Sequence, residues 1–249
     1  MKKTIITACI LVFLAATSAF ATEVSAGLTY DSQGDSFLIG TEFSLEETFE
    51  NNSNLSAELS YENNGVYSAS LLYNKYLSIF VLSGGINNNI NKTGIVPFIT
   101  GGAGIILNDF SLLASGGLNL SHDNVFKPDT YFCSADIIFD TGESIIDLSF
   151  LYKLNNSSAG SNSKIGGGLV FTAYKEDTPA EIKILTDVLY VNNTVTNISG
   201  VAVDAGLGIH VYLPFMSIKL KTMVDAWNPE RQLNSPIPFS IGLSTGFVL

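Results

Sequence analysis

The charged side chains between residues 180 and 227 are the groups of this chain that could act chemically on a solute. They lie in segments where polar and apolar residues alternate. In residues 201–213, for example, Asp204 and His210 lie between the apolar residues. The candidate set comprises Lys183, Asp187, Asp204, His210, Lys219, Lys221 and Asp225. Fixed charges of both signs on one surface could select solutes by charge. They could equally form a ladder of ion pairs that only stiffens a wall.

The same segments support catalysis weakly. Histidine is the usual general base, and the chain has only His122 and His210. His210 would lie roughly across from Ser217, but a chance pairing is expected in so serine-rich a chain. The stretch HDNVFKPD at residues 122–129 lacks the regular ligand spacing of a calcium loop. We therefore expect no enzyme activity, no metal site and no cofactor.

The composition limits the class of protein. Charged residues make up 14% of the chain, against about 25% in an ordinary soluble domain. The formal net charge of −11 argues against nucleic acid as a partner. No stretch after residue 21 stays apolar for the roughly 18 residues that a membrane helix needs. An apolar chain without such a helix can still pair every backbone polar group in lipid if it forms a closed β-barrel.

The first 21 residues predict a secretory signal peptide. Two lysines precede a short apolar core at residues 5–14, and Ala19-Phe20-Ala21 has the small-x-small form that signal peptidase accepts. Cleavage after Ala21 would leave residues 22–249 as one domain. Cys133 would then be the remaining cysteine, so we expect no intramolecular disulfide.

A period of two runs through residues 22–249 and predicts an all-β fold. Val24, Ala26, Leu28 and Tyr30, for example, alternate with small or polar residues. The alternation predicts a transmembrane antiparallel up-and-down barrel of about fourteen strands, with twelve as an alternative. The predicted strands are 24–30, 36–45, 55–61, 67–73, 76–82, 95–107, 110–121, 130–140, 144–153, 164–174, 180–191, 199–213, 216–227 and 237–249.

The connections between these strands favour the same fold. Short turns are predicted at 74–75, 108–109, 141–143, 175–179 and 214. Longer loops are predicted at 87–94, 122–129, 154–163, 192–198 and 228–236. Short periplasmic turns and longer outer loops are typical of bacterial barrels. The connection at 47–53 breaks the rule, because it is long where a short turn is expected.

If the apolar rows face lipid, the opposite rows line the lumen. The charged residues then predicted to point inward are Glu42, Glu58, Asp136, Asp147, Lys153, Lys164, Glu181, Lys183, Asp187, Asp204, His210, Lys219, Lys221 and Asp225. Carboxylates outnumber lysines in this set, so we expect a mild preference for cations. A turn at Leu213-Pro214 would place Lys221 diagonally from Asp204. The apolar residues predicted to point inward are Phe98, Ile106, Leu113, Phe132, Ile138, Val170, Leu185 and Leu189.

With its signal peptide, its alternation and its last strand, the chain resembles a bacterial outer-membrane β-barrel, porin-like in general form. In such proteins the last strand alternates apolar residues, ends on an aromatic one and is read by the barrel-assembly machinery. Here the alternating residues are Phe239, Ile241, Leu243, Phe247 and Leu249, so the final residue is leucine instead.

The resemblance implies that the protein lies in outer-membrane lipid and lets small solutes diffuse passively through a narrow channel. Fourteen strands lie between the small filled barrels and the wide aqueous porins. A structural or surface-interaction barrel without an open pore is therefore a second hypothesis. An outer-membrane hydrolase is a third.

Overall fold

The computed structural model describes residues 23–33, 36–49, 51–91, 94–119, 130–157, 159–174, 179–231 and 236–248. The predicted signal peptide with Ala21, the histidine at position 122 and the terminal Leu249 lie outside these residues. Within them the chain forms fourteen strands, and no helix is long and apolar enough to cross a membrane. The strands are β1 (Glu23–Gln33), β2 (Ser36–Phe49), β3 (Ser53–Glu62), β4 (Tyr67–Leu77), β5 (Phe80–Asn91), β6 (Gly94–Ile106), β7 (Phe110–Asn119), β8 (Thr130–Asp140), β9 (Ser144–Ser157), β10 (Gly160–Tyr174), β11 (Ala180–Asn193), β12 (Ile198–Leu213), β13 (Met216–Trp227) and β14 (Phe239–Val248).

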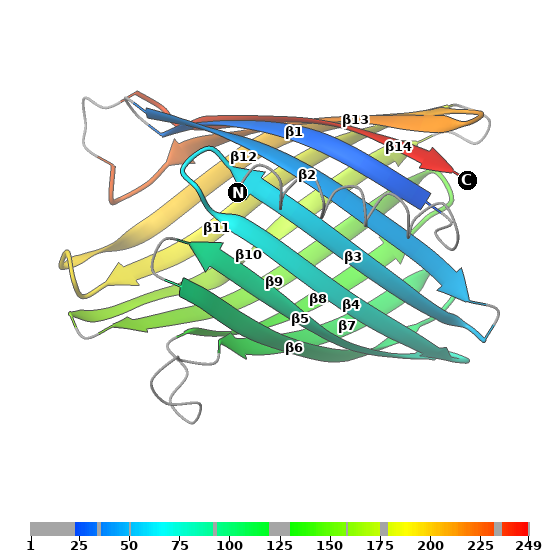
Figure 1. Cartoon of the computed structure of the whole chain (residues 1–249), viewed down its shortest axis with the longest axis horizontal. Coiled ribbons are helices and arrows are strands. Elements are labelled where there is room, and N and C mark those ends of the chain that lie inside the picture. The colour runs from blue at the N-terminus through cyan, green and yellow to red at the C-terminus, as the bar shows by residue number, and fades with distance from the viewer. Residues whose placement is uncertain are drawn as a thin grey trace, which may run out of the picture.

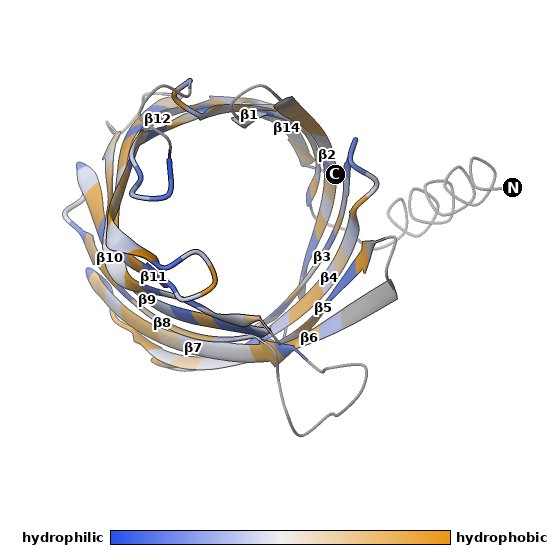
Figure 2. Cartoon of the chain, turned by 90° about the vertical axis from the view of Figure 1, so that its left-hand side faces the viewer, coloured by the Kyte–Doolittle hydropathy of each residue, from blue (hydrophilic) through white to orange (hydrophobic). Residues whose placement is uncertain are grey.

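Each strand pairs antiparallel with the strands before and after it in the sequence, and β1 pairs with β14 to close the barrel (Figure 1). The closing ladder runs from Glu23 opposite Val248 to Ser32 opposite Phe239. Viewed along the barrel, the strands form one ring (Figure 2). The predicted fold and strand number are confirmed, and the twelve-strand alternative is wrong. Closure removes the unpaired edges that an open sheet would expose in lipid.

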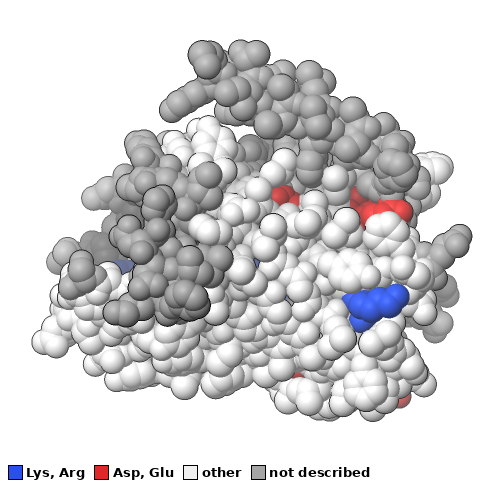
Figure 3. Space-filling model, turned by 60° about the horizontal axis from the view of Figure 1, so that its bottom comes forward, with Lys and Arg blue, Asp and Glu red and all other residues white. Residues whose placement is uncertain are grey.

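The two faces of the wall differ as the alternation predicts. On the outer face, large apolar side chains are exposed, among them Leu28, Ile182 and Leu207, which is 57% exposed. Figure 3 shows one side of this outer surface, where charged side chains are few. The interior is not a packed apolar core, since among the hydrophobic residues that the structure describes only Val81 and Val191 are buried. The apolar surface therefore faces outward, as a barrel in lipid requires.

The connections fall into two groups, at opposite ends of the barrel. The turn end holds the start of β1, the end of β14 and the connections that follow the even-numbered strands. The loop end holds the connections that follow the odd-numbered strands. The anomaly predicted at residues 47–53 disappears, because β2 continues to Phe49 and β3 begins at Ser53.

The turn predicted at residues 74–75 is wrong. β4 continues to Leu77, and the chain reverses at Ser78-Ile79, where Ser78 adopts a φ of 57°. As a consequence Tyr76, predicted on the lipid face, shares the inner face with Asn74 and lies opposite Val81. The turn was predicted too early because two adjacent polar residues, Asn74 and Lys75, interrupt the alternation although the strand continues through them.

Two predicted outer loops, 87–94 and 154–163, are largely strand, and the ends of a third, 192–198, are strand as well. β5 extends to Asn91, β9 to Ser157 and β11 to Asn193, each followed closely by its partner strand. The predicted loop at 122–129 lies outside the described residues, as do residues 232–235 of the loop at 228–236. The extensions are rich in Asn and Ser. Apolar residues therefore no longer alternate there, although the backbone remains hydrogen-bonded to the neighbouring strands. Lipid-facing alternation therefore marks the membrane-crossing part of a strand rather than its whole length.

Candidate functional site

The predicted charged residues of β11, β12 and β13 share the inner face of the barrel, but the register separates them into two bands. Asp187, Asp204 and Asp225 form one cross-strand line, which we call the acidic row. Lys183, His210, Lys219 and Lys221 form the basic band, which is nearer the turn end. Leu185, Gly206 and Met223 lie between the two bands. On these three strands, the inner wall therefore carries carboxylates toward the loop end and mainly cations toward the turn end.

The acidic row brings three carboxylates side by side. Asp204 is the direct partner of Asp187 on one side and of Asp225 on the other. The Asp187 carboxylate lies above Gly168 of β10, where a Cβ added to the glycine would clash with Asp187 Oδ1. The pairing of β12 with β13 shifts register between Val203 and Asp204, which places a bulge beside the row. Like charges directly opposite each other are destabilising, so this row is not a device for stability.

Asp225 is the member of the row that forms an ion pair with another described residue. Arg231 Nη1 lies 3.9 Å from Asp225 Oδ1, and the same guanidinium donates to the Asp225 backbone carbonyl at 2.8 Å. Asn228 Nδ2 donates to Asp225 Oδ2 at 3.0 Å. The segment after β13 thus folds back onto the acidic row and partly neutralises it. Arg231 and Asn228 were not among the predicted site residues, because both lie in a segment predicted only as a loop.

The basic band is organised around one carboxylate, Glu181. Tyr212 donates its hydroxyl to Glu181 Oε1 at 2.8 Å. The Lys183 ammonium lies 3.6 Å and His210 Nδ1 lies 3.8 Å from Glu181 Oε2. Tyr212 was not among the predicted site residues, although its position two residues after His210 places it on the inner face. The Glu181 carboxylate therefore contacts Tyr212, Lys183 and His210 on the inner wall.

Two lysines of the basic band are left without an acidic partner. Lys219 lies opposite His210, and Lys221 lies opposite Gly208. None of the ion pairs between described residues includes either lysine. Gly208, which has no side chain, lies between Lys183 and Lys221 as the cross-strand partner of both. These ammonium groups are available to a mobile anion or to a passing solute.

The register corrects two predicted neighbours. The β12–β13 hairpin turns at Pro214-Phe215, because Leu213 pairs with Met216. Lys221 therefore lies opposite Gly208 and not diagonally from Asp204, whose cross-strand partners are both carboxylates.

The same turn also changes the partners of the histidine and serine considered as a catalytic pair. Ser217 lies opposite Tyr212, while His210 lies opposite Lys219. Among the residues that the structure describes, no group of three or more His, Cys, Asp and Glu side chains is arranged to hold a metal ion.

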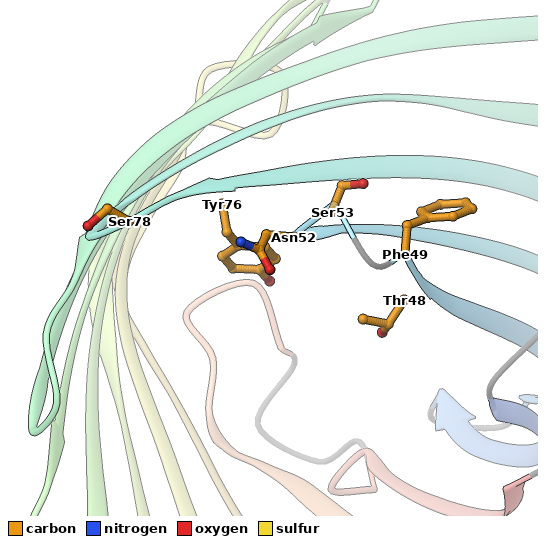
Figure 4. Close-up of a pocket in the computed structure, with 6 residues that line it drawn as sticks. All are labelled: Thr48, Phe49, Asn52, Ser53, Tyr76 and Ser78. Atoms are coloured by element: carbon orange, nitrogen blue, oxygen red, sulfur yellow. The ribbon is translucent and has the colours of Figure 1, made fainter.

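A small pocket at the turn end is a different feature. It has a volume of about 300 Å³ and lies between the turn after β2 and the turn after β4. Figure 4 shows the residues that line it: Thr48, Phe49, Asn52, Ser53, Tyr76 and Ser78. It has no charged side chain among these, so it offers no means of sorting solutes by charge.

Comparison with known proteins gives the fold but no family. The sequence matches no known protein-family model and no curated protein. Among solved structures, the NanC porin is 12% identical, with 91% of this chain and 100% of that chain aligned and a TM-score of 0.54. OmpT, an outer membrane protein of Vibrio cholerae, is 7% identical over 90% and 96% of the two chains, also at 0.54.

A third solved structure also aligns over nearly the whole chain at low sequence identity. The Acinetobacter baumannii outer membrane protein Omp33 is 12% identical over 92% of this chain and 98% of that chain, with a TM-score of 0.53. This chain has the fold of the bacterial outer-membrane β-barrels. At such low identity the likeness concerns the backbone alone, so the function must be argued from the residues of the inner wall.

Proposed function

We propose that this protein is a channel of the bacterial outer membrane through which small solutes diffuse passively. One observation carries the proposal: charged side chains line the inside of a closed barrel whose described residues form no packed apolar core. Charges that face water on the inner wall avoid the roughly 2–4 kcal/mol that Lys or Arg costs at the lipid midplane. Some of the similar structures are porins, which is consistent with the proposal.

Lipid and the barrel-assembly machinery are the other partners that we propose. On β14, the side chains of Phe239, Ile241, Leu243 and Phe247 are exposed on the outer face. This apolar strand pairs with β1 at the closing seam of the barrel. Its pattern fits the signal that assembly machinery reads in the proteins that this chain resembles.

The bands of the inner wall would give the channel its selectivity. The inward charged set predicted from the sequence holds eight carboxylates and five lysines, and the register places all of them on one face. A solute entering from the loop end would meet the acidic row first and the basic band second. The excess of carboxylates favours cations, while the free ammonium groups of Lys219 and Lys221 moderate that preference.

Recordings in planar lipid bilayers test the channel and its selectivity together. Under a salt gradient, the reversal potential of the wild-type barrel should report a mild cation preference. The double variant Lys219→Glu/Lys221→Glu should increase this preference, because it converts the unpaired cations of the basic band into carboxylates. Lys75→Glu is the matched control, because Lys75 shares its face with the outward Tyr73 and Leu77 near the turn end. Clear anion selectivity of the wild type would contradict the selectivity proposed here.

The alternative is a structural or surface-interaction barrel without an open pore. It is favoured by two loops that bend toward the middle of the ring at the loop end (Figure 2). A barrel that shows the heat-dependent gel mobility of a folded outer-membrane protein but no conductance would support this alternative. We propose no enzymatic activity, since the register keeps His210 away from Ser217.

A further inference from the structure

The inner wall also carries an aromatic feature, on strands distant from the two charged bands. Phe98 of β6 and Phe132 of β8 stack with ring centroids 5.5 Å apart and ring planes 6° from parallel. Both residues were predicted to point inward, but their contact was not predicted because β7 lies between their strands. Offset parallel rings are a favourable arrangement, and they expose a flat apolar surface.

Gly117 of β7 makes this contact possible. A Cβ at Gly117 would lie 2.6 Å from Phe98 Cε1 and 2.8 Å from Phe132 Cε1. The two rings therefore meet above Gly117, where β7 has no side chain to keep them apart. We call this pair of rings the aromatic platform. It is half-buried, so part of its surface remains accessible from the lumen.

Two lysines continue the wall directly beside the platform. Lys153 of β9 is the cross-strand partner of Phe132, and Lys164 of β10 is the partner of Lys153. Two ammonium groups opposite each other repel, and no ion pair between described residues includes either of them. Lys164 is within electrostatic range of Asp204, whereas the side chain of Lys153 is exposed. An anion between the two lysines would remove the repulsion.

We propose that the aromatic platform, Lys153 and Lys164 form a binding subsite for a ring compound that bears a carboxylate. The ring face would pack on Phe132 while the carboxylate accepts hydrogen bonds from the two ammonium groups. The required chemistry is shared by aromatic carboxylates and by cyclic acidic sugars, whose axial C–H groups also give an apolar face. The subsite deepens the proposed function, because it names a class of solute for the same lumen.

Equilibrium binding to the folded barrel in detergent tests the subsite without requiring conductance. Isothermal titration calorimetry would compare benzoate and glucuronate with acetate, which lacks the ring, and with benzyl alcohol and glucose, which lack the charge. We expect at least one ring carboxylate to bind more tightly than acetate and than its neutral counterpart. Tighter binding of benzoate would show that the subsite takes aromatic carboxylates, and tighter binding of glucuronate would show that it takes cyclic acidic sugars. Equal binding of acetate and both ring carboxylates overturns the proposal.

Variants locate the binding on the wall. Lys153→Gln should weaken binding of the preferred ring carboxylate on the order of tenfold, the effect of losing a hydrogen bond to a charged group. Phe132→Leu keeps apolar volume but removes the ring, and it should weaken the same ligand about threefold or more. Acetate binding should change in Lys153→Gln but not in Phe132→Leu.

Matched controls lie on the outer face. Phe139 is on β8 like Phe132, but its ring packs against Phe110 and is exposed on the outside. Phe139→Leu and Lys75→Gln should leave binding unchanged, with folding of every variant checked by heat-dependent gel mobility. If Phe132→Leu and Phe139→Leu have the same effect, the subsite is not where we place it. If the wild type binds a ring carboxylate but conducts no ions, the channel fails while the subsite stands.

Discussion

Asp204 of β12 and Asp225 of β13 are direct cross-strand partners on the inner wall, beside the register shift at Val203. Asp187 is the partner of Asp204 on the other side. A fold selected for stability alone would place a lysine at one of these positions, because opposed like charges are unfavourable. The arrangement is consistent with our proposal that the acidic row acts on solutes in the lumen.

Replacing the central carboxylate should therefore stabilise the barrel and reduce its selectivity. We expect Asp204→Asn to raise the free energy of unfolding by roughly 0.2–1 kcal/mol at low salt, the range for one cross-strand pair. The gain should shrink at high ionic strength, where the repulsion is screened. Urea unfolding in lipid vesicles measures the stability, and reversal potentials should show a weaker cation preference.

Asp31→Asn is the control for this change. Asp31 is also on the inner face, but its cross-strand partners are Ser240 and Leu38, so it has no carboxylate directly opposite. Its replacement should give no salt-dependent gain in stability. Equal gains in both variants would mean that the repulsion within the acidic row is already relieved by solvent.

The sequence predicted which residues share a face but not which residues meet. Alternation requires only that side chains point to opposite sides of a strand, so Asp204 and His210 could be assigned to the inner face without coordinates. Their partners depend on where the hairpin turns. A turn centred one residue later, at Pro214-Phe215, moves the cross-strand partner by two residues, which replaces Lys221 by Asp225 as a neighbour of Asp204.

Contacts across an intervening strand could not be predicted at all. Phe98 and Phe132 meet because Gly117 lies between them, and a glycine in a strand signals many things, including bends and bulges. The return of Arg231 to Asp225 depends on an irregular segment, which carries no periodic signal. The number of strands, and the facing of the site residues, could thus be predicted from the alternation. The facing of Tyr76 could not, because its turn was misplaced, and the neighbours of each site residue required the register.

Glu181 should balance the charge of the basic band, and this role can be separated from its hydrogen bond. Glu181→Gln removes the negative charge but leaves an oxygen that can accept from Tyr212, so the three lysines and His210 lose their compensation. Tyr212→Phe removes the hydrogen bond and leaves the charge. Reversal potentials should shift toward anions in Glu181→Gln and stay unchanged in Tyr212→Phe. Similar shifts in both variants would mean that the hydrogen bond, by orienting Glu181, matters more than the charge.

Because the outer face meets lipid and the inner face meets water, an arginine should cost much more stability on the outer face than on the inner face. Leu207→Arg places a guanidinium on the outer face, where Leu207 is 57% exposed, and should cost about 2–4 kcal/mol of stability in lipid. Leu185→Arg places the same group on the inner face, opposite Gly206, where water can solvate it. Unfolding in lipid vesicles should show a much smaller loss for Leu185→Arg. Equal losses would contradict the outward orientation of the apolar rows.

The aromatic platform predicts that Gly117 cannot carry a side chain. Gly117→Ala would place a methyl group 2.7 Å from the Ile99 carbonyl oxygen as well as against both rings. The rings could rotate away, but the backbone oxygen cannot move without disturbing the ladder between β6 and β7. We expect a loss of about 1–3 kcal/mol, typical of overpacking, together with weaker binding of ring carboxylates. Gly84→Ala is the control, because a Cβ at Gly84 would meet no atom within 4 Å. A neutral effect of both substitutions in urea unfolding would show that the two rings do not depend on the gap at Gly117.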